Sequence, residues 1–352
     1  MASTRRNLRI APGDAIVLVT GANGYIGSTV AEVLLEEGYN VRGTVRSAKP
    51  WLDKLFTDKY GSGRFESVVV SDLGNQAGFE RALQGTCGVV HVASDLTLDP
   101  DPEKVINGTI QHTLAAVRAA TNVPSIKSFV LTSSSTASIM PIPEKEGIYI
   151  DERAHPSFKR PDTWNDASVA AAWDENTSKE DLPYNVYAAS KTEGERALWK
   201  FVNENNPPFA VNTVLPAANY GTILAPEISG STMGWARQLL SGNSNVFTFT
   251  PPQWFVNVKD CARLHVAALL DRNVNHQRIF AFAEPVNWTD VVTILRNARP
   301  DNKRIPDPPA NEGRDLSQIG PRNKAEDLLK SFYGSAGWRS LRDSIVDGIS
   351  DL

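Results

Sequence analysis

The stretch "AIVLVTGANGYIGSTVAEVLLEEGYNVRGTVR", residues 15–46, decides the fold of this chain. A short, β-branched apolar run (15–20) meets a glycine-rich turn (21–27), and apolar residues at helical spacing then continue to Gly38. A second strand pattern at 41–46 completes a strand, turn, helix and strand. Because this is the length of one βαβ unit, the stretch predicts two parallel strands joined by a helix.

The same alternation continues along the chain as far as a sixth strand pattern at 210–216. The further expected strands are 65–70, 88–94 and 128–135, and the further expected helices are about 78–85, 103–122 and 183–203. Buried strands alternating with helices predict an α/β protein with a Rossmann-type, doubly wound, mainly parallel sheet. Beyond 217, Gly, Ser and Pro become frequent, which predicts a smaller C-terminal lobe that includes the strand pattern 278–284.

The composition is that of an ordinary globular protein, with 41% hydrophobic and 22% charged residues. The net charge of −4 does not favour nucleic-acid binding, and the one basic cluster, Arg5, Arg6 and Arg9, lies in a polar leader. No apolar run is long enough to span a bilayer. Cys87 and Cys261 are far apart and lack metal-ligand spacing. We therefore expect a cytoplasmic protein without disulfides and without a metal, membrane or nucleic-acid partner.

The glycine turn predicts a dinucleotide site. Gly21 suits the tight turn after the strand, Gly24 lets backbone approach a pyrophosphate, and Gly27 lets the helix pack closely on the sheet. The N–H groups that begin the helix are available to the phosphates. Glycines punctuate many ordinary turns, but here the turn lies between a strand and a helix, as this site requires. The residues expected to lie against the cofactor include Asn23, Tyr25 and Ile26.

The end of the second strand indicates which dinucleotide is bound. NAD-binding proteins usually place a carboxylate there, whereas the segment 41–50 has no acidic residue and carries Arg42 and Arg46. An arginine suits a 2′-phosphate, so NADPH/NADP+ is predicted, with Arg46 favoured by spacing and at least one arginine expected at the surface. The other residues expected near the cofactor are Asp72 and Leu73, although an aspartate in a turn is equally ordinary, and Ala93.

The segment "YAASK", 187–191, predicts the reacting centre. Tyr187 and Lys191 lie four residues apart on one helix face, a spacing that is common and uninformative by itself. The serines of "VLTSSS" end the strand 128–135, where ligands bind in a doubly wound sheet. Hydride reduction of a carbonyl needs a proton donor, a partner for the carbonyl oxygen and a positive group. Tyr187, Ser134 and Lys191 supply these, and Lys191 is expected to bind the nicotinamide ribose and to lower the pKa of Tyr187.

Other chemistry is less well supported by the sequence. His91 lies on an apolar strand and is expected to be a packed core residue. No Gly-x-Ser-x-Gly elbow surrounds Ser134, which disfavours a hydrolase. The acidic stretches near 144–152 and 174–181 are expected to be solvated loops. The remaining histidines, which share no spacing typical of a metal site, are His112, His155, His265 and His276.

"TGANGYIG", "VRGTVRS", "FVLTSSS", "YAASKTEGERALWKF" and "WFVNVKDCARLHVAALL" together resemble the extended short-chain dehydrogenase/reductases. Within them, the chain is most similar to yeast NADPH-dependent aldehyde and carbonyl reductases, relatives of dihydroflavonol reductase and cinnamoyl-CoA reductase. The resemblance runs from about residue 12 to "GWRSLRDSI" and assigns the catalytic roles to Ser134, Tyr187 and Lys191. It further implies nicotinamide contacts at Leu215 and Pro216 and substrate contacts near Ile139, Ser231, Trp235 and Gln253.

Two departures from the plant relatives bear on the substrate. Ile139 stands where dihydroflavonol reductases carry an asparagine, and "LPYNVYAASK" replaces the Asn-Trp-Tyr-Cys-Tyr stretch of cinnamoyl-CoA reductases. An apolar pocket for aldehydes, ketones or β-ketoesters is therefore expected. The predicted function is NADPH-dependent reduction of these small carbonyl compounds to alcohols. Two alternatives stay open: a sugar-nucleotide epimerase or dehydratase with tightly bound NAD, and a dinucleotide-sensing regulator without turnover.

The resemblance and the element pattern together predict two interleaved domains. We expect an NADP-binding domain at 12–216 that carries the catalytic residues, and a substrate-binding lobe mainly at 217–352, with segments near 255–270 returning to the first domain. The stretch 136–182 is expected to be long and irregular. Both a monomer and a homodimer remain compatible with the sequence.

Overall fold

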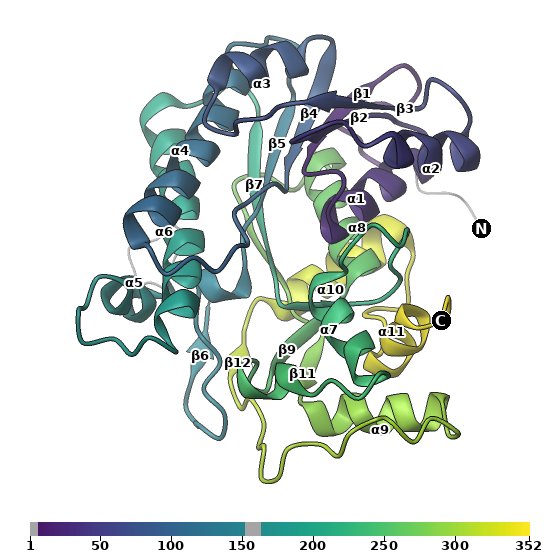
Figure 1. Cartoon of the computed structure of the whole chain (residues 1–352). Coiled ribbons are helices and arrows are strands. Elements are labelled where there is room, and N and C mark those ends of the chain that lie inside the picture. Colours follow the sequence, from purple (N-terminus) through teal and green to yellow (C-terminus); the bar gives the residue numbers. More distant parts are fainter. Residues whose placement is uncertain (1–5, 152–162) are drawn as a thin grey trace.

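The computed structural model describes residues 6–151 and 163–352, so Arg5 and His155 lie outside the described part. Its centre is a seven-stranded sheet in which every pairing is parallel (Figure 1). The strands are β1 (Ile16–Thr20), β2 (Asn40–Val45), β3 (Phe65–Val69), β4 (Thr86–His91), β5 (Ser128–Thr132), β7 (Ala210–Pro216) and β10 (Arg278–Ala281). Their order, β10-β7-β5-β4-β1-β2-β3, reverses direction between β1 and β4, where a doubly wound sheet binds its ligand. The predicted fold is confirmed.

Helices cover both faces of the sheet because alternate strand residues point in opposite directions. Val17 and Val19 of β1 pack into one apolar core, and Leu18 packs into the other. On the first face lie α1 (Tyr25–Glu36), α2 (Pro50–Tyr60), α8 (Val258–Leu270) and α10 (Arg322–Tyr333). On the second face lie α3 (Gln76–Leu83), α4 (Pro102–Thr121) and α6 (Leu182–Asn205). None of the described helices combines the length and apolarity needed to cross a membrane.

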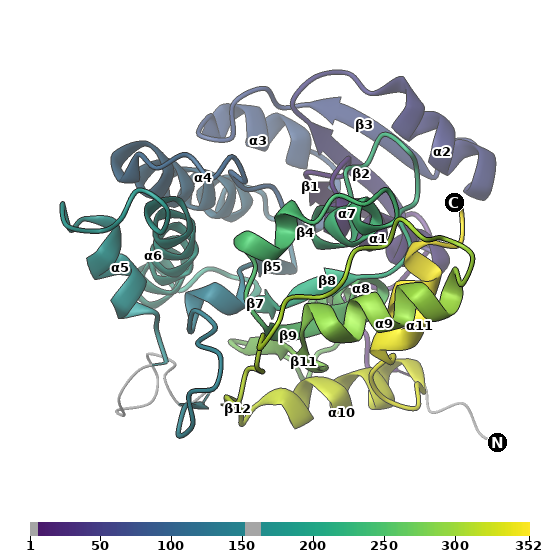
Figure 2. The ribbon, with the colours of Figure 1, turned by 60° about the horizontal axis from the view of Figure 1, so that its bottom comes forward.

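A second body of structure with its own apolar core packs beside the sheet (Figure 2). Its elements are β8 (Ala218–Tyr220), α7 (Ser231–Leu239), η3 (Asn245–Thr248), β9 (Gln253–Asn257), β11 (Glu284–Val286), α9 (Trp288–Ala298) and α11 (Leu341–Gly348). The Tyr25 hydroxyl donates to the Gly221 carbonyl across 2.8 Å, which joins the glycine turn to this lobe. The remaining elements are η1 (Ser135–Ala137), α5 (Asp166–Ala172) and the paired strands β6 (Tyr149–Ile150) and β12 (Gln318–Ile319).

The structure differs from the sequence-based prediction at three elements, of which the first is α5, a helix inside the stretch 136–182 that was expected to be irregular. The strand pattern 278–284, assigned to the lobe, begins with β10, which pairs with β7 as the edge strand of the main sheet. Helix α2 was not predicted, although Pro50 in its first turn and the buried Leu52 and Phe56, four residues apart, are signals for it.

Two buried histidines anchor the carboxyl ends of the central strands. Thr20 Oγ1 accepts the N–H groups of Val92 and Ala93, both at 3.0 Å, so it donates its own hydrogen to His91 Nδ1 at 2.9 Å. Burial lowers the pKa of His91 to about 3. The imidazole is therefore neutral, and it ties β1 to β4 where the glycine turn begins.

His265 of α8 makes an equivalent hydrogen bond to Thr132 at the end of β5. Its Nδ1 donates to the Cys261 carbonyl at 2.8 Å, so Nε2 accepts the hydroxyl hydrogen of Thr132, also at 2.8 Å. Burial lowers the pKa of His265 to about 4, and this ring is neutral too.

These two histidines predict how stability depends on pH. Their pKa values rise to about 6.5 on unfolding, so the unfolded chain binds more protons below that pH. The stability they contribute is complete above pH 6.5 and is lost as the pH falls toward 4, by about 1.4 kcal/mol per pH unit for each histidine. His91→Gln should make the decline in unfolding free energy between pH 6.5 and 4.5 shallower by that amount, measured by urea denaturation. His276→Gln, at an exposed position where burial lowers the pKa less than at His91, is the control and should change the slope less. An unchanged slope in His91→Gln would contradict the account.

Candidate active site

The glycine turn is held by close backbone contacts. Gly21 has φ +64°, and a Cβ there would lie 3.1 Å from the Ala93 Cα. A Cβ on Gly27 would lie 2.2 Å from the Gly21 carbonyl oxygen, so only glycine lets α1 begin this near the turn. No side chain caps α1, whose N-cap is Gly24, and the first N–H groups of the helix remain available to an anion.

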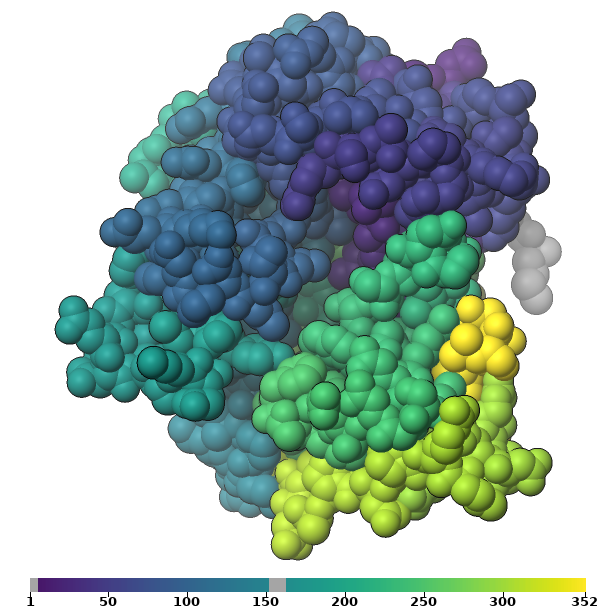
Figure 3. All heavy atoms as spheres, in the orientation of Figure 1, coloured from purple at the N-terminus to yellow at the C-terminus, as the bar shows by residue number. Residues whose placement is uncertain are grey.

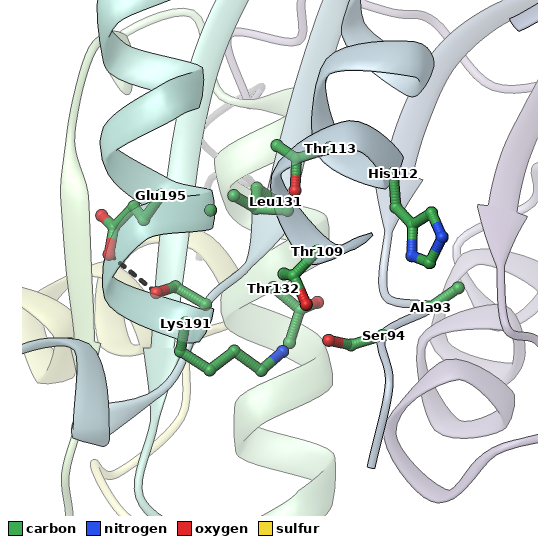
Figure 4. A pocket seen from close by; sticks show the side chains of 11 residues that line it. Ala93, Ser94, Thr109, His112, Thr113, Leu131, Thr132, Lys191 and Glu195 are labelled. Carbon is green, nitrogen blue, oxygen red and sulfur yellow. Dashed lines mark hydrogen bonds between the residues drawn. The ribbon is translucent and has the colours of Figure 1, made fainter. Parts of the chain in front are cut away.

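A narrow cavity lies beside this turn, between the end of β4, α4 and α6 (Figure 4). Ala93 and Ser94 line it from β4, His112 from α4 and Lys191 from α6. Among the described residues, Ser94 Oγ and His112 Nδ1 are buried without a hydrogen-bond partner. Buried polar atoms are normally paired, so these two and the open end of α1 fit a polar ligand such as a dinucleotide.

The two arginines around the end of β2 have different environments. Arg42 Nε bonds Glu66 at 2.6 Å, and its Nη1 donates to the carbonyls of Ala82 and Gln84 at 2.8 and 2.6 Å. Arg46 is exposed and makes no hydrogen bond or ion pair with any residue in the described ranges. Arg42 therefore braces the sheet, and Arg46 is the arginine with a free guanidinium.

Several charged side chains lie where the adenosine end of the cofactor is expected. Burial lowers the pKa of His112, and Asp72, Asp95 and Arg46 lie near enough to act on it. The Asp72 carboxylate also accepts the Gly74 N–H at 2.8 Å, as an aspartate does in a turn. Sequence reasoning considered His112 only as a metal ligand and missed Ser94, whose one signal was its place at the end of a strand.

Ser134 and Tyr187 come together from β5 and α6. Ser134 follows β5 as the N-cap of η1, where its Oγ accepts the N–H of Thr136 at 3.2 Å and the hydroxyl of Thr136 at 2.9 Å. Its own hydrogen is thus free to be donated elsewhere. The Tyr187 phenol, one residue type needed for proton donation, lies near enough to this serine for Ser134 to act on the pKa of the phenol.

The electrostatics of the site follow from burial. Burial raises the pKa of Tyr187, and the nearby Ser134 opposes this only in part. Burial also lowers the pKa of Lys191 to about 8, with the Glu195 carboxylate acting in the opposite direction. The expectation that Lys191 lowers the pKa of Tyr187 is not met, because the lysine extends into the cavity toward Ser94 (Figure 4). The result is a phenol that keeps its proton at neutral pH.

Aromatic side chains connect the lobe to α6. Trp235 of α7 meets Phe249 edge to face at 5.3 Å, and Phe249 stacks on Tyr184 at 6.5 Å. Tyr184 precedes Tyr187 by one helical turn, so this aromatic series leads to the reacting centre. The molecular surface is hollowed between the α4 side and the lobe (Figure 3). Sequence reasoning found Trp235 and missed Tyr184 and Phe249.

The other predicted substrate and nicotinamide residues occupy several elements. Ile139 packs on an apolar cluster that contains Leu215, and Pro216 is buried at the end of β7. Ser231 begins α7 with φ +47°. Gln253 begins β9, and its amide donates to the Pro251 carbonyl at 3.3 Å.

Comparison with known proteins places this geometry among reductases. Residues 17–163 match the NAD dependent epimerase/dehydratase family. The chain is 41% identical to the ketoreductase nvfG of Aspergillus novofumigatus, over 96% of this chain and 97% of that protein. It is also 41% identical to aldehyde reductase 2 of Sporidiobolus salmonicolor, over 96% of each. The structure of Gre2 in complex with NADPH from Candida albicans matches with a TM-score of 0.76 and 25% identity, over 96% of this chain and 99% of that one.

The glycine turn yields a matched pair of substitutions. Gly27→Ala should destabilise the protein and weaken dinucleotide binding, because its methyl group collides with the Gly21 carbonyl. Gly108→Ala, inside α4, meets only His112 Cε1 at 3.9 Å and should stabilise the protein by roughly 0.5–1 kcal/mol. Thermal unfolding and NADPH titration measure both effects. Equal behaviour of the two variants would show that the close approach of α1 does not matter.

Proposed function

The chain belongs to the extended short-chain dehydrogenase/reductases, matched as the NAD dependent epimerase/dehydratase family, and we propose that it reduces aldehydes, ketones or β-ketoesters with NADPH. The family prediction is confirmed, and the relatives named ketoreductase and aldehyde reductase support an oxidoreductase. One observation carries the proposal. Lys191 and Ala93 line one cavity beside the glycine turn, and Tyr187, next to Ser134, precedes Lys191 by one turn of α6.

The described residues fit NADPH as the cofactor. Gly21, Gly24 and Gly27 would receive the pyrophosphate, and the free guanidinium of Arg46 would bind the 2′-phosphate. Ser94 and His112 offer their unpaired atoms along the cavity. The complex of the Candida relative with NADPH supports the same choice. When bound, NADPH supplies the hydride that reaches the carbonyl carbon.

Two side chains would then act on the carbonyl oxygen, and a third, Lys191, on the cofactor. The Ser134 hydroxyl, whose lone pairs accept from Thr136, donates a hydrogen bond to that oxygen. Tyr187 gives its phenolic proton to the oxygen as negative charge develops there. The ammonium of Lys191 binds the ribose hydroxyls and so places the nicotinamide ring beside Tyr187. Trp235 and Phe249 would supply an apolar wall for the remainder of the substrate.

A kinetic assay tests the assignment of the donor. With a panel of β-ketoesters and aromatic aldehydes, NADPH oxidation at constant pH should fall about 10²- to 10⁴-fold in Tyr187→Phe, with NADPH affinity retained. Tyr184→Phe, one turn away on the same helix, should keep kcat within a few-fold. Full turnover by Tyr187→Phe would refute the role of Tyr187, and tight binding of NAD without carbonyl reduction by the wild type would favour an epimerase.

The cofactor preference gives an independent prediction. Arg46→Ala should raise the KM for NADPH by about 10- to 100-fold, the worth of a hydrogen bond to a charged group, and leave the KM for NADH unchanged. Arg42→Ala should lower the melting temperature while the ratio of the two KM values stays constant, because Arg42 braces β2. The same ratio in Arg46→Ala as in the wild type would exclude the 2′-phosphate contact.

Lys191 predicts a pH dependence. Its ammonium is the working form, so the rate of reduction should fall as the pH rises through the lysine pKa of about 8. Lys191→Arg keeps its charge above that pH and should lose this alkaline limb, at a lower absolute rate. The measurement is kcat from pH 6 to 10. The same fall of kcat at alkaline pH in Lys191→Arg would show that a group other than Lys191 causes it.

A further inference from the structure

Glu195 is a completely buried carboxylate two helical turns beyond Tyr187. It accepts five hydrogen bonds. Oε1 accepts from Thr213 Oγ1 and Arg278 Nε, both at 2.7 Å, and from Trp199 Nε1 at 3.1 Å. Oε2 accepts from Ser133 Oγ at 2.7 Å and from Arg278 Nη2 at 3.1 Å. The single side chain therefore binds α6 to β5, β7 and β10, three adjacent strands of the sheet.

Arg278 compensates the charge of this carboxylate. The two side chains are 0% and 1% exposed, and the arginine binds bidentately from the first residue of β10. The central carbon of its guanidinium, Cζ, lies 4.0 Å from the centre of the Trp164 ring. A buried ion pair is often no more stabilising than well-packed apolar side chains of the same volume, so stability alone does not explain this arrangement.

The Glu195–Arg278 pair lies next to the proposed reacting centre. Ser133 is the neighbour of Ser134, and Glu195 follows Lys191 by four residues on the same helix face. Lys191, Ser133 and Glu195 line the same cavity, with the Ser133–Glu195 hydrogen bond at its wall (Figure 4). We infer that Glu195, charged and oriented by Arg278, is a positioning residue that fixes Ser134 through Ser133 and sets a negative charge one helical turn beyond Lys191.

The charged surroundings of Lys191 support this role. His91 of β4 and His265 of α8 are neutral rings, and burial lowers the pKa of His112 of α4 as well. Tyr187 keeps its proton because burial raises its pKa. The carboxylate that raises the pKa of Lys191 is Glu195, whose own pKa Arg278 keeps low despite burial.

The inference rests on the proposed function and is tested with a double variant, Glu195→Gln/Arg278→Met. Glu195→Gln alone leaves a buried guanidinium unpaired and is expected to fold poorly. The double variant removes both charges. Ser133 and Thr213 donate to different oxygens of Glu195, so the glutamine oxygen can accept from one of these hydroxyls while its NH2 group donates to the oxygen of the other. It should fold, bind NADPH and reduce the ketone. The fall of kcat at high pH should occur about one pH unit lower than in the wild type, which is a roughly tenfold loss of kcat at pH 8–9.

The matched control is Glu193→Gln/Arg196→Met. This pair lies on the same helix with an N–O distance of 2.7 Å, but both side chains are 28% exposed and neither residue lines the cavity. Its pH profile should superimpose on that of the wild type. If Glu195 and Arg278 only stabilise the fold, the folded double variant will show the wild-type profile as well, and that result would overturn the inference.

Failure of the proposed function gives a different pattern. A wild type that reduces no carbonyl refutes the reductase, and the inference is then judged by NADPH binding, followed by fluorescence from pH 6 to 10. Loss of affinity about one pH unit earlier in the double variant than in the wild type supports the inference. Coincident binding curves, or a wild type that binds no NADPH, overturn it.

Discussion

The parallel pairing of β1 with both β2 and β4 is the constraint on which the rest of the structure depends. Because every strand of the sheet runs in one direction, the residues that follow them meet along one edge. The glycine turn follows β1, Arg46 follows β2, Ala93 follows β4 and Ser134 follows β5. Helix α6 then needs only to lie across that edge for Tyr187 and Lys191 to complete the site. Strand direction brings four distant segments together, and α6 adds a fifth.

Burial at this edge decides how the polar groups behave. Removal from water raises the pKa of the Tyr187 phenol and lowers that of the Lys191 ammonium, which favours the neutral form of each. A proton donor benefits directly from this shift. The lysine needs an opposing charge, and Glu195 supplies it from the interior of the protein, where solvent does not screen it. The same reasoning keeps His91 and His265 neutral beneath the strand ends.

Local patterns predicted the parts of the site that are local in sequence. The glycine turn, its helix and the Tyr187–Lys191 face each lie within one short segment whose spacing reports its geometry. The strand 278–284 was placed in the lobe because nothing near Arg278 shows that it pairs with β7. The contact of Tyr184 with Phe249 joins residues 65 positions apart and was missed for the same reason. Substrate specificity depends on long-range contacts of the same kind, because the proposed apolar wall of the substrate site combines residues of the lobe with residues of α6.

The central claim is that a hydride passes from NADPH to a carbonyl carbon beside Tyr187. The most direct measurement is to supply the wild-type protein with NADPH carrying deuterium at both C4 positions, together with a β-ketoester, and to analyse the alcohol by mass spectrometry and NMR. The account predicts one deuterium on the carbinol carbon of every product molecule, and none elsewhere. Unlabelled alcohol, or oxidation of NADPH without any alcohol, would contradict it.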